Sequence, residues 1–375
     1  MDWAIVGRVA VFAIGAAVLL ATLGSAVRTV ILPRGIQAKL ATAVFLATRA
    51  VFRLRVGRAP TYERRDRVMS GYGPVSLLTL ALVWQLAVGV AYTAMFWSLG
   101  TRPLRAAFLM SGSSLYTLGF DHPDGLPASA LSFSEAALGL GLLALLISYL
   151  PTLYNAFSRR EVFVAQLEVR AGSPPFGPAM IERYANIGWL GGMAALWERW
   201  EGWFVELEET HTSFPALVFF RSPQPEHSWI TAAGAMLDGA AMASSTLADH
   251  DADAEIMLRA GYLSLRRIAD YFAIPYDKSP SPDDPISVAR DEYDAAYDRL
   301  DAAGVALKSD RDQAWRDFAG WRVNYDTVLI TLAALVVAPT APWSSDRSVT
   351  AFRPTVLRGR RPGQARNGRR RTPRP

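Results

Sequence analysis

Five consecutive residues, Thr117-Leu118-Gly119-Phe120-Asp121, have the composition of a site for a dehydrated monovalent cation. Removing water from such an ion is costly, so a site must replace the water with other oxygen atoms at once. Extended backbone supplies carbonyl oxygens for this purpose, and Thr117 can add a hydroxyl oxygen. Such a backbone requires a glycine, because positive φ angles are costly for residues with side chains. We therefore expect Thr117, Leu118, Gly119 and Phe120 to form an ion filter.

Acidic residues follow the filter motif at its expected outer mouth. Asp121 belongs to the predicted filter, and Asp124 lies three residues further on. Carboxylates at the mouth of a pore concentrate cations electrostatically. The alternative is that both aspartates are ordinary turn residues before a loop that contains proline and glycine.

Stretches without charged side chains must position this motif. Residues 68–101 and 136–158 are uncharged, and each exceeds the roughly 20 residues that a helix needs to cross a membrane. Between them, 106–120 is uncharged but too short to cross. We expect an outer helix, a re-entrant loop at 104–120 and an inner helix. Residues 103–110 are expected to form a short helix at the start of the loop.

This arrangement resembles the pore module of potassium channels over about residues 75–157, and T-L-G-F is similar to the T-V-G-Y and T-I-G-F filters of that family. The resemblance implies a homotetramer that conducts potassium, with bending of the inner helix at Gly139 and Gly141. The sequence departs from the family pattern after the aromatic residue, where Asp121 and His122 replace a second glycine and an aspartate. Pro151 adds a kink that we expect near the cytoplasmic end of the inner helix, and we group it with the two glycines as a gating hinge.

A further uncharged stretch of nineteen residues lies at 9–27, within a predicted N-terminal transmembrane helix at 1–27. The alternative is a cleaved secretory signal peptide, with Arg8 as its basic flank and Gly24-Ser25-Ala26 as the cleavage site. Nineteen residues are long for the core of a signal peptide, which favours a retained helix.

Basic residues set the predicted orientation. The linker 28–74 carries ten basic residues against two acidic ones, so the positive-inside rule predicts that it is cytoplasmic. Within it, 36–56 is interpreted as an amphipathic helix at the interface, its basic face toward anionic lipid headgroups; a tilted fourth span is the alternative. The pore module 75–160 then has its loop outside, and the inner helix 136–157 returns to the cytoplasm.

The C-terminal half differs in composition. Apolar residues recur at helical spacing across 171–340, which predicts an acidic all-α cytoplasmic domain, with one helix opening at Asp284-Pro285. The apolar run 214–220 is a possible docking surface for the membrane domain. The tail 347–375 has ten arginines and no acidic residue, so we expect it to be disordered and to contact anionic lipid.

Cysteine is absent, and no nucleophile elbow, Walker loop or metal-binding spacing is present. We therefore expect no enzyme, cofactor, catalytic residue or metal site. The fold class that the sequence predicts is an all-α integral membrane protein, with a pore-loop module and a helical cytoplasmic domain. The predicted function is a multi-pass cation channel of the cell membrane. The alternative is a non-conducting, membrane-anchored interaction or sensor protein whose helical domain binds a partner.

Overall fold

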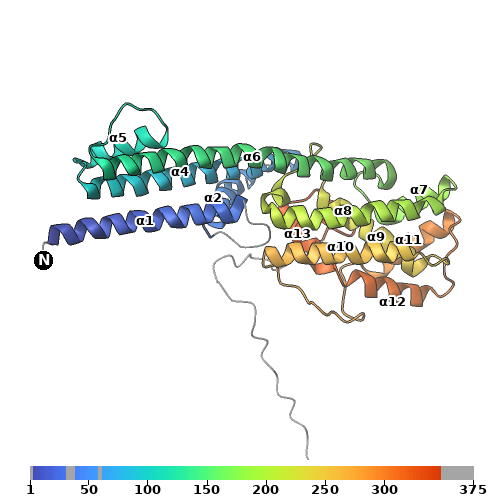
Figure 1. Cartoon of the computed structure of the whole chain (residues 1–375). Helices are drawn as coiled ribbons and strands as arrows, with labels where there is room; N and C mark the ends of the chain where they lie inside the picture. Colours follow the sequence, from blue (N-terminus) through green and yellow to red (C-terminus); the bar gives the residue numbers. More distant parts are fainter. Residues whose placement is uncertain (1–2, 31–38, 58–60, 348–375) are drawn as a thin grey trace, which may run out of the picture.

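The computed structural model describes residues 3–30, 39–57 and 61–347. Every regular element in these ranges is a helix, apart from one isolated bridge between Leu247 and Leu307. Three of these helices are long and apolar enough to cross a membrane: α1 (Trp3–Val30), α4 (Tyr72–Leu99), which α3 (Tyr62–Ser70) precedes directly, and α6 (Leu126–Ala171). The protein is therefore an all-helical membrane protein. The long helices form one end of an elongated molecule, and a helical domain forms the other (Figure 1).

The first two long helices pack antiparallel through a small residue. Gly15 of α1 approaches Ala91 of α4 so closely that a Cβ atom at Gly15 would lie 2.7 Å from the Ala91 carbonyl oxygen. Further along the same contact, the Trp84 indole donates a hydrogen bond of 3.2 Å to the Ser25 hydroxyl. Small residues that allow backbones to approach are typical of helix contacts in membranes.

Helix α6 joins the two halves of the molecule. It runs unbroken for 46 residues, from Leu126 to Ala171, with Pro151 inside it. The helix predicted at 136–157 is thus the middle of a longer one. Its first part packs with α4, and its last part packs on the helical domain (Figure 1).

The helix predicted at 36–56 is present as α2 (Lys39–Val56), and residues 31–38 lie outside the described part of the chain. It is not one of the three helices that are long and apolar enough to span. Its Arg53 and Arg55 are exposed, while Phe52 packs edge-on against Tyr72 at the start of α4, with 5.7 Å between ring centroids. The arginine-rich tail lies outside the described residues, except for Arg347.

The C-terminal domain is built around one buried helix, α9 (Trp229–Thr246), in which every residue is buried. Small side chains make this possible, because ten of its eighteen residues are alanine, glycine or serine. The helices and turns that complete the domain are α7 (Gly177–Asn186), η1 (Leu190–Gly192), α8 (Met193–Ser213), η2 (Pro215–Phe219), α10 (Ala252–Tyr271), α11 (Arg290–Ala302), α12 (Arg311–Arg322) and α13 (Asp326–Val336).

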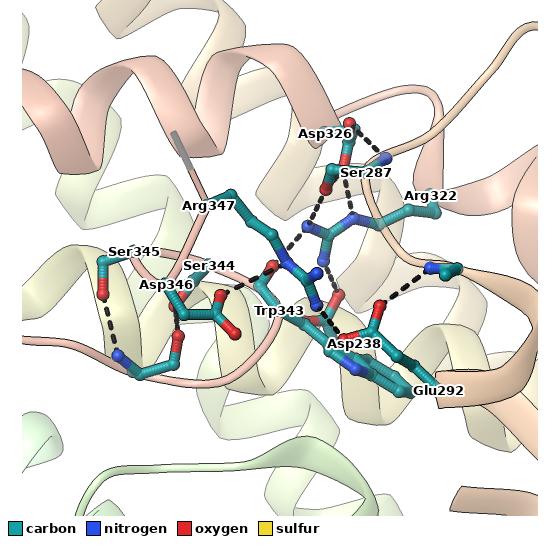
Figure 2. Close-up of polar contacts among 12 residues, drawn as sticks. Asp238, Ser287, Glu292, Arg322, Asp326, Trp343, Ser344, Ser345, Asp346 and Arg347 are labelled. Carbon is teal, nitrogen blue, oxygen red and sulfur yellow. Dashed lines mark hydrogen bonds and ion pairs between the residues drawn. The ribbon is translucent and has the colours of Figure 1, made fainter. Parts of the chain in front are cut away.

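A buried ionic network fixes the centre of this domain (Figure 2). Arg322 is fully buried and pairs with Asp238 of α9 and, at 2.7 Å, with Asp326 of α13. Ser287 donates its hydroxyl and its backbone N–H to the two carboxylate oxygens of Asp326. Burial opposes the charge on Arg322, but the two carboxylates outweigh it and raise the pKa of the guanidinium. Because removing one partner would leave an uncompensated buried charge, this network holds three helices together.

One predicted helix start in this domain is wrong. The chain forms turns around Asp284-Pro285, and α11 begins only at Arg290. The Glu292 carboxylate accepts a hydrogen bond from the backbone N–H of Ala289 and so caps this later start. Ser287 is held instead by Asp326, 39 residues away, and residues 284–289 stay outside helical geometry.

The apolar run 214–220 docks on the membrane helices, as its composition predicted. Phe219 packs edge-on against Tyr72 of α4, with 5.2 Å between ring centroids, and Phe214 packs against Tyr149 of α6 at 5.5 Å. Phe220 lies so close to Gly73 that a Cβ atom there would be 2.8 Å from its ring. The helical domain is therefore seated directly on two of the long helices.

A second junction ties α2 and α3 to the end of α13. Arg221 pairs with Asp66 and donates to the carbonyl oxygens of Val336 at 2.6 Å and Val337 at 3.0 Å. Arg49 donates to the Leu335 carbonyl oxygen at 2.7 Å. The last carbonyl groups of a helix have no partner within the helix, and here two arginines supply the missing donors.

Candidate functional site

The candidate site is built on a short helix, α5 (Leu104–Leu115), which lies against α4 and α6 at the end of the bundle away from the helical domain (Figure 1). We call this the distal end. The helix begins after Pro103, which has no backbone N–H to leave unpaired. With twelve residues it is about 18 Å long, too short to cross a membrane.

Helix α5 penetrates the bundle from the distal end to about half its depth. Leu115, its last residue, contacts Gly89 of α4 and Gly139 of α6. Gly89 lies ten residues before the end of α4 at Leu99, which corresponds to about 15 Å along that helix, half of the roughly 30 Å hydrocarbon thickness. The chain then returns to the distal end, where α6 begins at Leu126. The segment thus enters and leaves on the same side.

Glycine permits the closest contact in this arrangement. A Cβ atom at Gly139 would lie 2.3 Å from the Leu115 carbonyl oxygen, well inside van der Waals contact, so only glycine fits there. Gly141 faces open space, and α6 continues through both glycines and through Pro151. Gly139 therefore has a packing role in this conformation. A hinge at Gly139, Gly141 and Pro151 stays a prediction.

The predicted filter residues form the turn that ends α5. Thr117 has a φ of 54°, and its backbone N–H donates to the Ser114 carbonyl oxygen at 3.1 Å. The N–H of Leu118 donates to the Ser113 carbonyl oxygen at 2.8 Å. This pair of bonds is a Schellman cap, which satisfies two carbonyl groups at the helix end. Gly119 has a φ of 70°, in the region that favours glycine.

The predicted filter is exposed in the single chain. Leu118 is 61% exposed and Phe120 is 58% exposed, and Thr117 and Gly119 are exposed as well. The half-buried Asp121 donates its backbone N–H to the Ser113 hydroxyl at 3.2 Å. It is not among the described non-glycine residues with positive φ. The five residues thus lie together at the tip of α5, where the single chain leaves residues 117–120 exposed.

A cluster of polar side chains lies behind this turn, inside the bundle, and sequence reasoning missed it. Its centre is the fully buried Glu135 of α6. One carboxylate oxygen, Oε1, is 2.5 Å from the Ser111 hydroxyl of α5, and that hydroxyl is 3.0 Å from the Gly89 carbonyl oxygen of α4. A side chain from each of two helices and a backbone group from the third therefore meet at one point.

Further polar contacts surround this point. The Tyr92 and Ser134 hydroxyls are 2.8 Å apart. Those of Ser114 and Ser132 are 2.6 Å apart. The Gln85 amide donates to the Gly139 carbonyl oxygen at 3.3 Å, while its Oε1 is buried and has no partner among the described residues. Polar groups inside apolar bundles are costly unless they are paired, which makes such clusters functional candidates.

The signal for the cluster is present in the sequence. Glu135 is the only charged residue between Gly125 and Ser158, and Ser111-Gly112-Ser113-Ser114 is a hydroxyl-rich run within a short apolar segment. A charged residue inside a spanning helix marks a functional position by default. Uncharged stretches alone do not reveal Glu135, because the stretch 136–158 begins at the next residue.

Chemically, the site offers backbone oxygens at the tip of a half-depth helix, supported from behind by a buried carboxyl group. Comparison of the chain with protein-family models, with curated proteins and with solved structures found no match. The residues and their geometry are therefore the basis on which a function is inferred.

Proposed function

We propose that this protein is one subunit of a homotetrameric cation channel, in which Thr117, Leu118, Gly119 and Phe120 of each chain surround a common axis. The observation that carries the proposal is the half-depth course of α5 between two helices long enough to span. Irregular backbone at membrane depth is tolerated only where protein or a water-filled path surrounds it. The exposed turn at 117–120 needs such surroundings, and further copies of the chain would provide them.

The chemistry of the turn supports cation binding. Within the described part of the chain, no hydrogen bond reaches the carbonyl oxygens of residues 117–120, which leaves them available as ligands. The C-terminus of α5 adds the negative end of a helix dipole at the same place. One chain provides a single strand of ligands, so we infer a closed ring of four copies. Potassium is the expected ion, although Asp121 stands where the related pattern has glycine.

The proposed orientation is that of a multi-pass protein of the cell membrane, with the helical domain in the cytoplasm and the tip of α5 open to the outside. The exposed Arg53 and Arg55 of α2 support a cytoplasmic position for that end. At the distal end, the Arg102 guanidinium lies 3.6 Å from the centre of the Trp97 ring. Tryptophan is enriched at membrane–water interfaces, which supports an outer interface at this end of the bundle. The helical domain would assemble or gate the pore.

Ion flux tests the proposal. The full-length protein would be reconstituted in liposomes that hold a potassium gradient, and flux would be followed with a fluorescent reporter. Wild-type protein should conduct, and Gly119→Ala should abolish the flux, because alanine at a φ of 70° costs about 1–2 kcal/mol and displaces the adjoining carbonyl groups. Gly112→Ala is the matched control: this glycine lies inside α5, and a Cβ atom there would meet nothing within 4 Å.

The outcomes separate the filter from the fold. If Gly112→Ala conducts and Gly119→Ala remains a folded tetramer without flux, the filter assignment holds. Equal flux in both variants would show that the filter lies elsewhere. Absence of flux from folded wild-type protein, with any alkali cation, would refute the channel itself.

A second candidate function is that of a non-conducting, membrane-anchored interaction or sensor protein. One observation favours it: Thr117 and Leu118 cap α5 in a compact turn, whereas a conducting filter needs its residues extended. Under this alternative, the helical domain is the functional part and binds a partner. A silent wild-type protein that nevertheless forms a stable oligomer would support it.

A further inference from the structure

Glu135 is a buried acid at membrane depth, and the proposed filter makes no direct use of it. It lies nine residues after the start of α6, about 14 Å along the helix from the distal end. Its side chain is fully buried, and no Lys or Arg forms an ion pair with it among the residues that the structure describes. An ionised carboxylate there would have no counter-charge to offset its lost hydration.

The hydrogen bonds around Glu135 indicate where a proton lies. A serine hydroxyl carries one hydrogen, yet the Ser111 Oγ is 3.0 Å from the Gly89 carbonyl oxygen and 2.5 Å from Glu135 Oε1. The carbonyl can only accept, so Ser111 donates to it. A hydrogen must then lie between Ser111 and Glu135, and the carboxyl group can supply it. A contact of 2.5 Å is typical of a strong O–H···O bond.

The second carboxyl oxygen agrees with this assignment. Glu135 Oε2 is buried and has no hydrogen-bond partner in the described part of the chain. In a carboxylate this oxygen would carry about half of a negative charge with nothing to stabilise it. In a protonated carboxyl group it is a neutral carbonyl oxygen, for which the cost of burial without a partner is far smaller.

Groups facing Glu135 from the neighbouring elements offer no cation. Helix α4 is uncharged and presents Tyr92, one turn from Gly89. Helix α5 has a single charged residue, Arg105, which is exposed near its distal start. The returning loop carries Asp121, His122 and Asp124, which include two further acids. Among the described residues, the hydrogen-bonded cluster around Glu135 thus contains no Lys, Arg or His side chain.

We propose that Glu135 is a proton-binding site inside the membrane, which holds a proton at neutral pH and, through Ser111 and the Gly89 carbonyl group, fixes α5 against both long helices. When base removes this proton to water, the Ser111 hydroxyl turns its hydrogen to the carboxylate, and its bond to the Gly89 carbonyl group, which ties α5 to α4, is lost. Alkaline pH therefore loosens the end of α5 from α4, together with the turn that α5 carries. The consequence for conduction rests on the proposed channel function, whereas the proton site itself does not.

Infrared spectroscopy of the full-length protein in lipid bilayers tests the site without reference to conduction. The difference spectrum between wild type and Glu135→Gln at pH 7 should contain the C=O stretch of a carboxylic acid, which shifts in D2O. Glutamine has the shape of the protonated side chain, so the variant should fold. Ser111→Ala should move the band to higher frequency, since its hydrogen bond is lost. Ser129→Ala should leave it in place, because this half-buried serine of α6 donates to the Gly125 carbonyl oxygen and not to Glu135.

Flux measurements test the consequence. Flux from wild-type protein should fall about tenfold per pH unit once the proton is lost, whereas the ratio of flux at high and neutral pH should stay near one in Glu135→Gln. Absence of the acid band at pH 7 would overturn the proton site, whatever the flux. A band present in a protein that never conducts would leave the site standing and refute the channel. A band present with no alkaline loss of flux would refute the link to α5.

Discussion

The close contact between α5 and α6 gives the sharpest prediction about how the half-depth helix is held. Replacing Gly139 by alanine would place a Cβ atom 2.3 Å from the Leu115 carbonyl oxygen and 3.0 Å from Leu115 Cδ1. Ordinary contact begins at 3.4 Å, so the two helices must separate by about 1.1 Å, the difference between these distances. Overpacking of this kind costs about 1–3 kcal/mol, and here the opposing atom is backbone, which cannot rotate away.

The matched control lies two residues along the same helix. Gly141→Ala makes the same chemical change where a Cβ atom meets nothing within 4 Å, so it gains only the helix propensity of alanine, about 1 kcal/mol. Thermal unfolding of the purified protein, followed by circular dichroism, should therefore show a lower midpoint for Gly139→Ala than for wild type, and an equal or higher midpoint for Gly141→Ala. Equal midpoints for the two variants would refute the packing of α5 against α6.

Two further predictions concern the helical domain and its junction. Asp66→Asn should lower the free energy of unfolding by about 3 kcal/mol, because Arg221 would keep its buried charge without a carboxylate. Glu206→Gln, at the exposed pair with Arg159, should lower it by less than about 1 kcal/mol. Urea titration of the two variants compares these values. Burial, with Arg160 nearby, lowers the pKa of His211 well below its usual 6.5. Below pH 6.5 the unfolded chain therefore binds a proton that the folded chain does not, and the free energy of unfolding should fall by about 1.4 kcal/mol per pH unit. Melting temperatures between pH 7 and pH 5 test this, and His211→Gln should flatten the dependence; an unchanged slope would assign it to other groups.

Charge and length explain why the membrane half could be predicted from sequence. Hydrocarbon excludes charge, so uncharged stretches of sufficient length locate helices α1, α4 and α6 without reference to packing. The same argument indicates a segment too short to span, but the short helix predicted at 103–110 continues to Leu115 as α5. Helix ends were less predictable, because α6 continues beyond the bilayer-sized stretch and packs on the helical domain.

Long-range contacts explain what the sequence did not reveal. The predicted start at Asp284 is a sound local signal, yet the bond between Ser287 and Asp326 overrides it. The network of Arg322 with Asp238 joins residues 84 apart in the chain, and nothing local indicates that pairing. Glu135 differs, because its signal is local: it is the single charged residue between Gly125 and Ser158.

Single-channel recording tests the central claim most directly. The purified full-length protein would be inserted into a planar lipid bilayer that separates unequal potassium concentrations. The account predicts discrete current steps whose reversal potential follows the cation gradient, and which vanish in Gly119→Ala. Stable tetramers of wild-type protein that carry no current under any alkali cation, in a bilayer where a control channel conducts, would contradict it.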